Sequence, residues 1–543
     1  MRPQTVLRDR FVQDNGRVSG CRLHGLFCVY QVGCICAKFD SIETAITLGR
    51  ELALNSIVSC AYQQPAATRR IADVAGPRGW PLLGNMPQIE VPRMHAQLEA
   101  WAARYGSIYR VKLSFRDALV VSRPDLVAAI FRDRPDGWSR LGTMQSVIRE
   151  IALDGLFSSE GDNWRRQRRL IMSAFDPGHL RQYFPSLRRV TQRLKQRLDA
   201  AAREQESIDL QRVLMRYTVD VTAGLAFGVD MNTQQDPDNA LQSHLDKVFP
   251  MFARRISAAF PWWRYVKLPS DRVFDRHLAK LRAAVLGFVQ TARERLDRDP
   301  ELREHPTNLL EAMLAAHDES GMLSEEELVG NVFTMLLAGE DTTANTLCWT
   351  LYLLHTHREA WDELVADVDR LLGPDVLPES FDTARELGSI EHCANEAMRL
   401  RPVAPMFFIE NNRATTLDGI AVPAGTFVIC LTRPGAVDPV VCADAAGFRP
   451  SRWERGATAG DEHQGDTANR ALLKASVPFG AGPRICPGRY LALLQMKMVL
   501  AMLARNYELV EVGTEDGAPP RERFAFAMSP VGLRMKIAMR HGI

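Results

Sequence analysis

The chain has 543 residues, of which 46% are apolar and 24% are charged, the balance of a soluble globular enzyme. This composition excludes a disordered or fibrous chain. The formal net charge of +2 argues against nucleic acid as the main partner, because nucleic-acid-binding proteins usually carry a strong basic excess. Of the 67 basic residues, 58 are arginine and nine are lysine, a skew that we interpret as the mark of a GC-rich, bacterial genome.

The ten cysteines do not form a regular framework. Half of them lie in the first 60 residues, the others are scattered, and no two are spaced as a CxxC pair. The spacing therefore indicates neither a zinc site nor a disulfide scaffold. A reduced, cytoplasmic chain fits this pattern best. The five early cysteines are Cys21, Cys28, Cys34, Cys36 and Cys60.

Residues 1–75 differ from the rest of the chain. Their most apolar stretch, Gly25 to Ala37, is interrupted by Gln31 and is shorter than the ~20 residues that a membrane-spanning helix needs. No short basic start leads directly into it, as a signal peptide would require. We therefore expect no transmembrane anchor, and we interpret residues 1–75 as a poorly ordered extension or the product of an upstream start codon.

The folded enzyme is expected to span residues 76–543. It opens with the segment Gly76 to Asn85, which contains two prolines and three glycines and so is not helical. We interpret this segment as a strap that lies over a folded body. Residues 456–469, rich in Gly, Asp, Thr and Ala, are expected to form a surface loop.

The middle of the chain has mainly helical patterns. The clearest helix begins at Ser324, which forms a capping-box pair with Glu327, and runs to about His357. Strand patterns are short and few. The predicted fold is mainly α with small β-sheets. The other predicted helices are 95–105, 160–174, 183–204, 270–297, 358–373, 390–400 and 488–505, and the predicted strands are 107–113, 117–122, 417–422 and 426–431, with more near the C-terminus.

One cysteine near the C-terminus lies in an unusual loop. Glycines and a proline surround Cys486 in the segment Phe479 to Gly488, directly before a predicted helix. Backbone N–H groups at such a turn, together with the helix N-terminus, stabilise a thiolate. A buried structural cysteine in a glycine loop is the alternative interpretation of this motif alone.

This segment resembles the haem-ligand loop Phe-x-x-Gly-x-Arg-x-Cys-x-Gly of the cytochrome P450 superfamily. Four further segments match the family in its order and spacing, so that the resemblance covers about residues 76 to 540. It implies a single P450 haem domain that binds haem b, with Cys486 as the iron ligand. The four segments are Trp164 with Arg168, Ala338 to Thr343, Glu396 to Arg399, and Phe448 to Trp453.

The resemblance also implies roles for residues around the haem. Trp164 and Arg168, one turn apart on a helix, would face the haem propionates, and so would Arg484 from the ligand loop. Phe479, at the start of that loop, would contact the haem. A basic solvated helix is the competing interpretation for Arg168, because three more arginines crowd the same segment. Those three residues, Arg165, Arg166 and Arg169, would then suit an acidic electron-donor protein.

The Glu-x-x-Arg segment is expected to have a structural role. Glu396 and Arg399 share one helical face, and the resemblance adds Arg452 as the third member of a charged triad that holds the core behind the haem loop. Without the resemblance, a solvated ion pair on a helix would be the simpler interpretation.

Asp341 and Thr342 are the candidate catalytic residues. Both are modest helix formers that compete for backbone hydrogen bonds, so we expect a local distortion of the long helix there. Activation of oxygen consumes protons, and an alcohol–acid pair is suited to deliver them. A capping pair at a helix break is the alternative.

These residues predict a monooxygenase that inserts one oxygen atom from O2 into a small lipophilic substrate. The apolar segments Val403 to Phe408 and Phe524 to Met528 would line the substrate pocket. No flavin or nicotinamide domain fits in the remaining length, so electrons would come from a ferredoxin or flavodoxin-type donor with its NAD(P)H reductase. The alternatives are a peroxide-using or rearranging relative of the same fold and a non-catalytic haem-thiolate sensor.

The N-terminal extension generates the first prediction. Deleting residues 1–65 should leave a folded, haem-loaded enzyme, because this segment lacks a strong core pattern and precedes the strap. The haem content of the purified truncated protein tests this, and loss of haem incorporation would show that the segment belongs to the fold.

Overall fold

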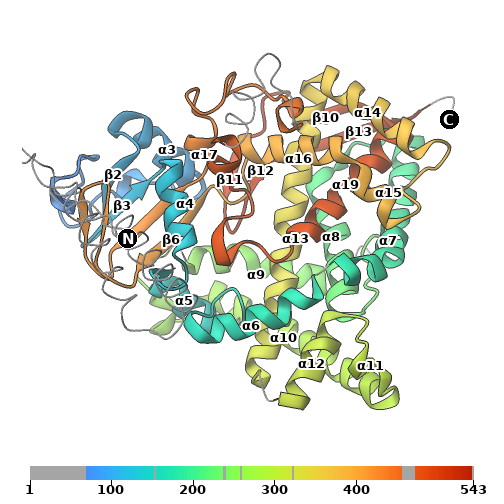
Figure 1. The fold of residues 1–543 in the computed structure, drawn as a ribbon, viewed down its shortest axis with the longest axis horizontal. Coiled ribbons are helices and arrows are strands. Elements are labelled where there is room, and N and C mark those ends of the chain that lie inside the picture. The colour runs from blue at the N-terminus through green and yellow to red at the C-terminus, as the bar shows by residue number, and fades with distance from the viewer. Residues whose placement is uncertain are drawn as a thin grey trace, which may run out of the picture. The chain divides into compact units, whose positions relative to one another are not determined.

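The computed structural model describes residues 69–151, 155–175, 177–235, 240–256, 258, 260–320, 323–454 and 471–540. The chain divides into two units, Met1–Thr68 and Arg69–Ile543, and only the second is described. Most of the proposed extension 1–75 and the predicted loop 456–469 therefore lie outside the described residues. Helices dominate the described unit and its sheets are small, as the sequence predicts (Figure 1).

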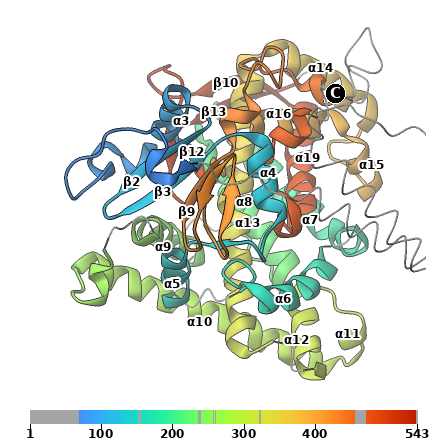
Figure 2. The same cartoon turned by 60° about the vertical axis from the view of Figure 1, so that its left-hand side comes forward.

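Helix α13, Glu325–Thr356, runs through the middle of the unit in both ribbon views (Figures 1 and 2). It begins as predicted, because the Ser324 side chain accepts a hydrogen bond from the Glu327 N–H while the Glu327 carboxylate accepts one from the Ser324 N–H. Its residues are buried on most sides, so it is a core helix surrounded by other elements.

The other predicted helices are also present, with ends that differ from the prediction by a few residues. The largest difference is at α7, which begins six residues earlier than expected. These helices are α3 (Met94–Tyr105), α6 (Gly161–Ala174), α7 (Pro177–Arg203), α10 (Pro269–Arg298), α14 (Arg358–Leu372), α16 (Gly388–Leu400) and α19 (Arg489–Asn506).

Several helices were not predicted. Helix α8, Leu210–Phe227, is the most important of them, and it lacks a simple apolar stripe because it is buried along most of its length. The rest are mostly short, and short apolar runs do not distinguish helix from strand. They are α4 (Pro124–Arg132), α5 (Gly142–Glu150), α9 (Ala240–Ile256), α11 (Glu301–Glu304), α12 (Leu309–Ser320), α15 (Phe381–Glu386) and α17 (Arg433–Ala436).

The largest sheet has five strands in the order β2-β3-β9-β6-β4. Strands β3 and β9 are parallel and the other pairs are antiparallel. β6 leads out of the segment that follows α16, and so carries Met406, Phe407 and Phe408 towards the centre of the molecule. The strands are β2 (Ile108–Leu113), β3 (Arg116–Val121), β9 (Phe427–Leu431), β6 (Met406–Asn411) and β4 (Trp138–Arg140).

The predicted strand 417–422 is a hairpin of two strands, β7 (Thr415–Leu417) and β8 (Ile420–Val422). The turn residues Asp418 and Gly419 both have positive φ, which ends the first strand. Strand β1, Arg69–Arg70, pairs with β8, so the described fold already includes residues that precede the strap at Gly76.

The C-terminal part forms two further sheets. One consists of β10 (Tyr507–Gly513), β13 (Arg534–Met539) and the short β5 (Ile208–Asp209). The other is a two-stranded hairpin of β11 (Glu522–Phe524) and β12 (Met528–Pro530), whose strands pair in antiparallel register with Phe524 opposite Met528.

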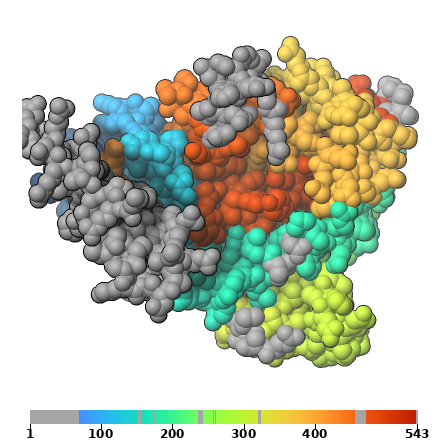
Figure 3. All heavy atoms as spheres, viewed as in Figure 1, coloured from blue at the N-terminus to red at the C-terminus, as the bar shows by residue number. Residues whose placement is uncertain are grey.

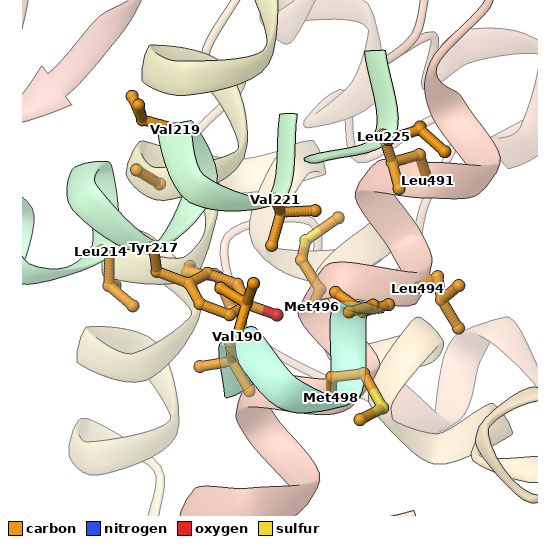
Figure 4. Packing of buried hydrophobic residues seen from close by; sticks show 14 of the residues in the cluster. Val190, Leu214, Tyr217, Val219, Val221, Leu225, Leu491, Leu494, Met496 and Met498 are labelled. Carbon is orange, nitrogen blue, oxygen red and sulfur yellow. The ribbon is translucent and has the colours of Figure 1, made fainter. Parts of the chain in front are cut away.

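The core joins segments that are far apart in the sequence. Val190 of α7, Tyr217 and Leu225 of α8, and Leu491 and Met496 of α19 pack in one buried cluster (Figure 4). On the face shown in Figure 3, the red segments near the C-terminus lie against the green segments of α6 and α7. The C-terminal third is therefore part of the central core, which also contains α8 and α13.

Helices α8 and α13 approach each other closely at Gly339. A Cβ atom at this position would lie 2.4 Å from Oγ1 and 2.9 Å from Cγ2 of Thr222. Because both branches of the threonine side chain are within 3 Å, rotation about its χ1 angle does not relieve the clash. Gly339 thus allows the two helices to pack at this distance.

The close approach generates a prediction about stability. Gly339→Ala should lower the free energy of unfolding by about 1–3 kcal/mol, because overpacking outweighs the better helix propensity of alanine. Gly287→Ala in α10, where no atom lies within 4 Å of the added Cβ, should instead raise it by about 0.5–1 kcal/mol. Denaturant unfolding of the two variants measures the difference, and an equal response would contradict this packing argument.

Candidate functional site

The candidate site is a cavity of about 380 Å³ in the centre of the unit. Its walls come from α13, from the loop before α19, from the segment that leads into β6, and from the turn between β11 and β12. Most lining residues are apolar. Six of the predicted site residues line this cavity, namely Trp164, Arg168, Thr342, Phe479, Arg484 and Cys486.

The loop before α19 holds Cys486 in place through its backbone. The Cys486 N–H donates to the Phe479 carbonyl at 2.9 Å. Gly480 and Gly482 have φ values of 72° and 68°, and a Cβ atom on Gly482 would lie 2.4 Å from the Phe131 carbonyl oxygen. Glycine is therefore required for the loop to bend back and turn the cysteine into the cavity.

The surroundings of the Cys486 sulfur have opposing effects. Burial raises the pKa of the thiol, whereas the Gly488 N–H and the charges of Arg168 and Arg489 lower it. A cation bound to the sulfur would shift this balance to the thiolate. Among the described cysteines, Cys486 alone lines the cavity, since Cys348, Cys393, Cys430 and Cys442 are buried elsewhere.

Trp164, Arg168 and Arg484 form one edge of the cavity. The Arg484 guanidinium lies 4.7 Å from the centroid of the Trp164 ring, donates to the Ser159 carbonyl at 2.6 Å and pairs with Glu160. Arg168 donates to the Ile485 carbonyl at 2.7 Å and so ties α6 to the cysteine loop. The three side chains predicted to face a carboxylate ligand are thus close together.

Two further arginines at this edge were missed by sequence reasoning. Arg134 is 4% exposed, and its Nε and Nη2 atoms have no hydrogen-bond partner among the described residues. Arg140 lies over the Phe157 ring at 3.7 Å and donates to the Phe157 carbonyl at 2.5 Å. Neither belongs to a recognisable motif, and in a chain with 58 arginines nothing local distinguishes them.

The four arginines outnumber the acids around them. The pKa of Arg484 is lowered to about 10, because burial and repulsion from Arg134 and Arg168 outweigh the opposing charge of Glu160. Burial, with repulsion from Arg134 and Arg484, also places the pKa of Arg140 well below its usual value. Buried cations without matched anions are unfavourable, so the site fits a ligand with more than one negative charge. Haem has two propionates, and the residues at this edge therefore fit it.

The predicted triad of Glu396, Arg399 and Arg452 is assembled and buried. Glu396 and Arg399 form a bidentate pair, with both N–O distances 2.8 Å, and Arg452 Nε lies 2.7 Å from the same carboxylate. Trp453 Nε1 and the Arg449 N–H complete the donors to Glu396. Burial raises the pKa of Glu396, but Arg399 and Arg452 lower it more, so the carboxylate stays charged.

Arg399 also connects the triad to the segment from Ala436 to Gly447, which follows Arg399 in the sequence. Its Nη1 and Nη2 atoms donate to the carbonyls of Ala436, Ala445 and Gly447. The triad does not line the cavity, and it fixes backbone on the far side of α16.

Asp341 and Thr342 are neighbours in α13 but have different surroundings. Thr342 lines the cavity, and its hydroxyl donates to the Ala338 carbonyl at 2.9 Å. Asp341 lies outside the lining and accepts a hydrogen bond from Asn345 Nδ2 at 2.5 Å. Burial raises the pKa of Asp341 to about 6, although Asn345, the Ala527 amide and the charge of Arg523 lower it.

The expected distortion of the long helix is not observed. α13 is continuous from Glu325 to Thr356. The threonine hydroxyl shares the carbonyl four residues earlier with the helical N–H, and the aspartate accepts from a side chain on the next turn, so both side chains are satisfied without a break in the helix.

The comparisons with known proteins agree with this geometry. The family model for Cytochrome P450 matches residues 74–537. The chain is 28% identical to the putative cytochrome P450 CYP13A4 of Caenorhabditis elegans over 86% of this chain and 94% of that protein. It is 26% identical to cytochrome P450 3A31 of Mesocricetus auratus, over 80% and 85%, and 25% identical to thromboxane-A synthase of Rattus norvegicus, over 93% and 99%.

These relatives come from animals, so they give no support to the expectation of a bacterial source. Within the part of the chain that the structure describes, no helix has both the length and the apolarity needed to cross a bilayer.

The buried triad generates a prediction about stability. Glu396→Ala should lower the free energy of unfolding by about 3–5 kcal/mol, because it leaves Arg399 buried without its counter-charge. Asp362→Ala, which removes the exposed i,i+4 partner of Arg358 at 3.2 Å, should change it by less than about 0.5 kcal/mol. Denaturant unfolding measures both, and a small effect of Glu396→Ala would mean that the triad is not needed for stability.

Proposed function

Because the chain belongs to the cytochrome P450 family, we propose that it inserts one oxygen atom from O2 into a small lipophilic organic substrate. The family places it among the haem-thiolate monooxygenases, which bind haem b through a cysteine thiolate. The observation that carries the proposal is that Cys486 and Thr342, from distant segments, line one cavity together with four arginines.

In this proposal Cys486 supplies the thiolate, and the arginine edge holds the haem propionates. Haem iron with a thiolate ligand activates dioxygen, because the thiolate pushes electron density onto the iron and favours O–O cleavage. Gly488 and Arg168 stabilise negative charge on the sulfur. Phe479 and Trp164 contribute apolar and aromatic surface to the cavity wall.

In this proposal Thr342 and Asp341, both in α13, supply the protons. The Thr342 hydroxyl lies in the cavity wall, where it would act as a proton donor to oxygen bound in the cavity. Asp341 lies behind it, and its pKa of about 6 means that near neutral pH it exchanges protons readily between its two forms. We propose that Asp341 passes protons inward from solvent and Thr342 delivers them.

The substrate would be apolar, since the segments from Val403 to Phe408 and from Phe524 to Ala527 contribute only apolar residues to the wall. Electrons would come from a separate ferredoxin or flavodoxin-type protein with its NAD(P)H reductase. Exposed Arg169 on α6 is available to such an acidic donor, whereas Arg165 and Arg166 are already paired with Asp162 and Glu327.

A rearranging or peroxide-using enzyme is the second candidate function. The similarity to thromboxane-A synthase over almost the whole chain favours it. The presence of Thr342 in the cavity wall favours the monooxygenase. Turnover of a lipophilic substrate with NAD(P)H, ferredoxin and ferredoxin reductase separates the monooxygenase from both alternatives. A rearranging enzyme needs no reductant, and a haem-thiolate sensor gives no product at all.

The first test concerns the ligand. The reduced carbon monoxide complex of the enzyme should show the red-shifted absorption band of thiolate ligation, and Cys486→Ser should lose it. Cys442→Ser is the matched control, since that cysteine lies outside the cavity and should leave the band unchanged. A band that survives in Cys486→Ser would refute the assignment.

The second test concerns proton delivery. Thr342→Ala should retain haem and NAD(P)H consumption, but product per electron should fall and hydrogen peroxide should rise, because O2 that has taken up two electrons and two protons then leaves as hydrogen peroxide before its O–O bond breaks. Positioned acid–base groups typically change rates by ~10²–10⁴-fold, so the effect should be large. Asp341→Asn should instead slow overall turnover.

The matched control is Thr356→Ala, whose hydroxyl bonds back to Tyr352 at 3.1 Å on the same helix. Its coupling of electrons to product should equal that of the unmodified enzyme. Unchanged coupling in Thr342→Ala would mean that water or the substrate carries the proton.

A further inference from the structure

The turn between β11 and β12 contacts both the substrate side of the cavity and the acid behind it. Phe524, Ala525, Phe526 and Ala527 all line the cavity. The backbone amide of Ala527 faces the Asp341 carboxylate closely enough to lower its pKa. A single four-residue segment, made of the last residue of β11 and the three-residue turn after it, therefore connects the place where substrate binds to the proposed proton donor.

The base of this hairpin is held by an unusually dense set of charges around Glu522. Its carboxylate lies 2.7 Å from His95 Nε2, 2.6 and 3.0 Å from Arg433 Nη1 and Nη2, and 3.2 Å from Arg401 Nη1. Arg433 also binds Glu99 of α3, with Nη2–Oε2 2.5 Å. The hairpin is thereby fixed to α3 and to the segments that follow α16 and β9.

Of the two acids in this cluster, Glu522 and Glu99, only Glu522 belongs to the hairpin. His95 and Glu99 come from α3, one turn apart, and Arg433 opens α17. The Glu522 side chain is 17% exposed and that of Arg433 is 11% exposed, so solvent screens their interaction weakly. Burial raises the pKa of Glu522, but His95 and Arg433 lower it far more, so the carboxylate is charged throughout the working pH range.

The position of the hairpin determines the electrostatic surroundings of Asp341. Within α13, the carboxylate faces Asn345, which is held in turn by Gln211 of α8, and the buried thiol of Cys348, which also faces Asp209. From the hairpin it faces the Ala527 amide and the charge of Arg523. Among the described groups that influence Asp341, Arg523 is the one cation, and the Ala527 amide also lowers the pKa. Loss of both from its surroundings would raise the pKa of Asp341 as long as the carboxylate stays buried.

From this geometry we propose that Glu522 is a positioning residue that acts through the β11–β12 hairpin, keeping the Ala527 amide and the charge of Arg523 near Asp341 while placing Phe524 to Ala527 in the substrate pocket. The proposal rests on the proposed role of Asp341 in proton delivery. It also links substrate binding to proton delivery. A substrate that displaces the turn would change the proton affinity of Asp341.

The test compares Glu522→Gln with Glu515→Gln in the full-length, haem-loaded protein. Glu515 is 81% exposed, lies in the loop before the hairpin and pairs only loosely with Arg534 at 3.6 Å. Glu522→Gln should speed hydrogen exchange of the backbone amides in residues 522–530 by at least tenfold and raise the KM for substrate. Glu515→Gln should change neither.

The second readout is the titration of Asp341, followed by the infrared carbonyl band of the protonated carboxyl that disappears in Asp341→Asn. In Glu522→Gln the pKa should rise. A rise of one unit from about 6 lowers the ionised fraction at pH 6 about fivefold. Because a proton donor works only while protonated, the limb of turnover that falls with increasing pH should move to higher pH, and this shift should vanish in the Asp341→Asn background.

Arg523→Gln provides an independent test in case Glu522→Gln does not fold. Arg523 is exposed, so its replacement leaves the base of the hairpin intact and removes only the charge near Asp341. It should raise the pKa of Asp341 without changing hydrogen exchange. An Asp341 titration identical in Glu522→Gln, Arg523→Gln and Glu515→Gln would overturn the proposal. A shifted titration combined with normal turnover of Asp341→Asn would retain the positioning role and refute the proposed role in proton delivery.

Discussion

The excess of buried positive charge at one edge of the cavity is the constraint on which the rest of the structure depends. Arg134, Arg140, Arg168 and Arg484 meet there, and Glu160 is the acid that offsets them. Removing an ion from water carries a penalty of several kcal/mol even after relaxation. Arg134 has two nitrogen atoms without a hydrogen-bond partner among the described residues, so these residues recover only part of this penalty, through the charge of Glu160. We therefore expect a dianionic ligand to stabilise the folded state itself, and binding of haem to be linked to folding.

The surrounding fold holds this site from two sides. On one side, Glu396 is saturated with donors and Arg399 binds three backbone carbonyls, so that α16 and the loop beyond it are held together. Gly339 lets α8 and α13 pack at a distance that no larger residue permits. On the other side, Glu522 holds the base of the β11–β12 hairpin, and Phe526 in its turn packs against the rings of Phe157 and Phe252. Substrate and proton delivery would thus depend on one hairpin.

The sequence predicts the features that are written in local patterns. The capping pair Ser324–Glu327 marks the start of α13, and the glycine spacing around Cys486 marks the ligand loop. Strands β7 and β8 were merged because their two-residue turn interrupts an apolar run only briefly. Helix α8 was missed because burial on nearly all sides leaves no amphipathic stripe. Features whose cause lies within a few residues of sequence were predicted. Features that depend on a brief turn or on burial by distant segments were not.

The features that depend on tertiary structure were not predictable. The role of Arg134 and Arg140 is visible only in the folded chain, where they lie near Arg484, which is more than 300 residues away in the sequence. Asp341 and Thr342 are adjacent in sequence, yet only the folded helix reveals that one lines the cavity and the other faces the C-terminal hairpin. The role of Glu522 is equally hidden, because its partners lie on α3, after α16 and after β9.

Binding of haem and of haem dimethyl ester to the apoprotein tests the central claim most directly, because the two ligands differ only at their propionates, which the ester carries as neutral methyl esters. Leaving buried charges without their partners is worth about 3–5 kcal/mol, so the ester should bind at least about 100-fold more weakly. In Arg134→Gln the difference between the two ligands should shrink. Equal affinity of the apoprotein for haem and its dimethyl ester would contradict the claim that the arginine edge exists to hold a dianion.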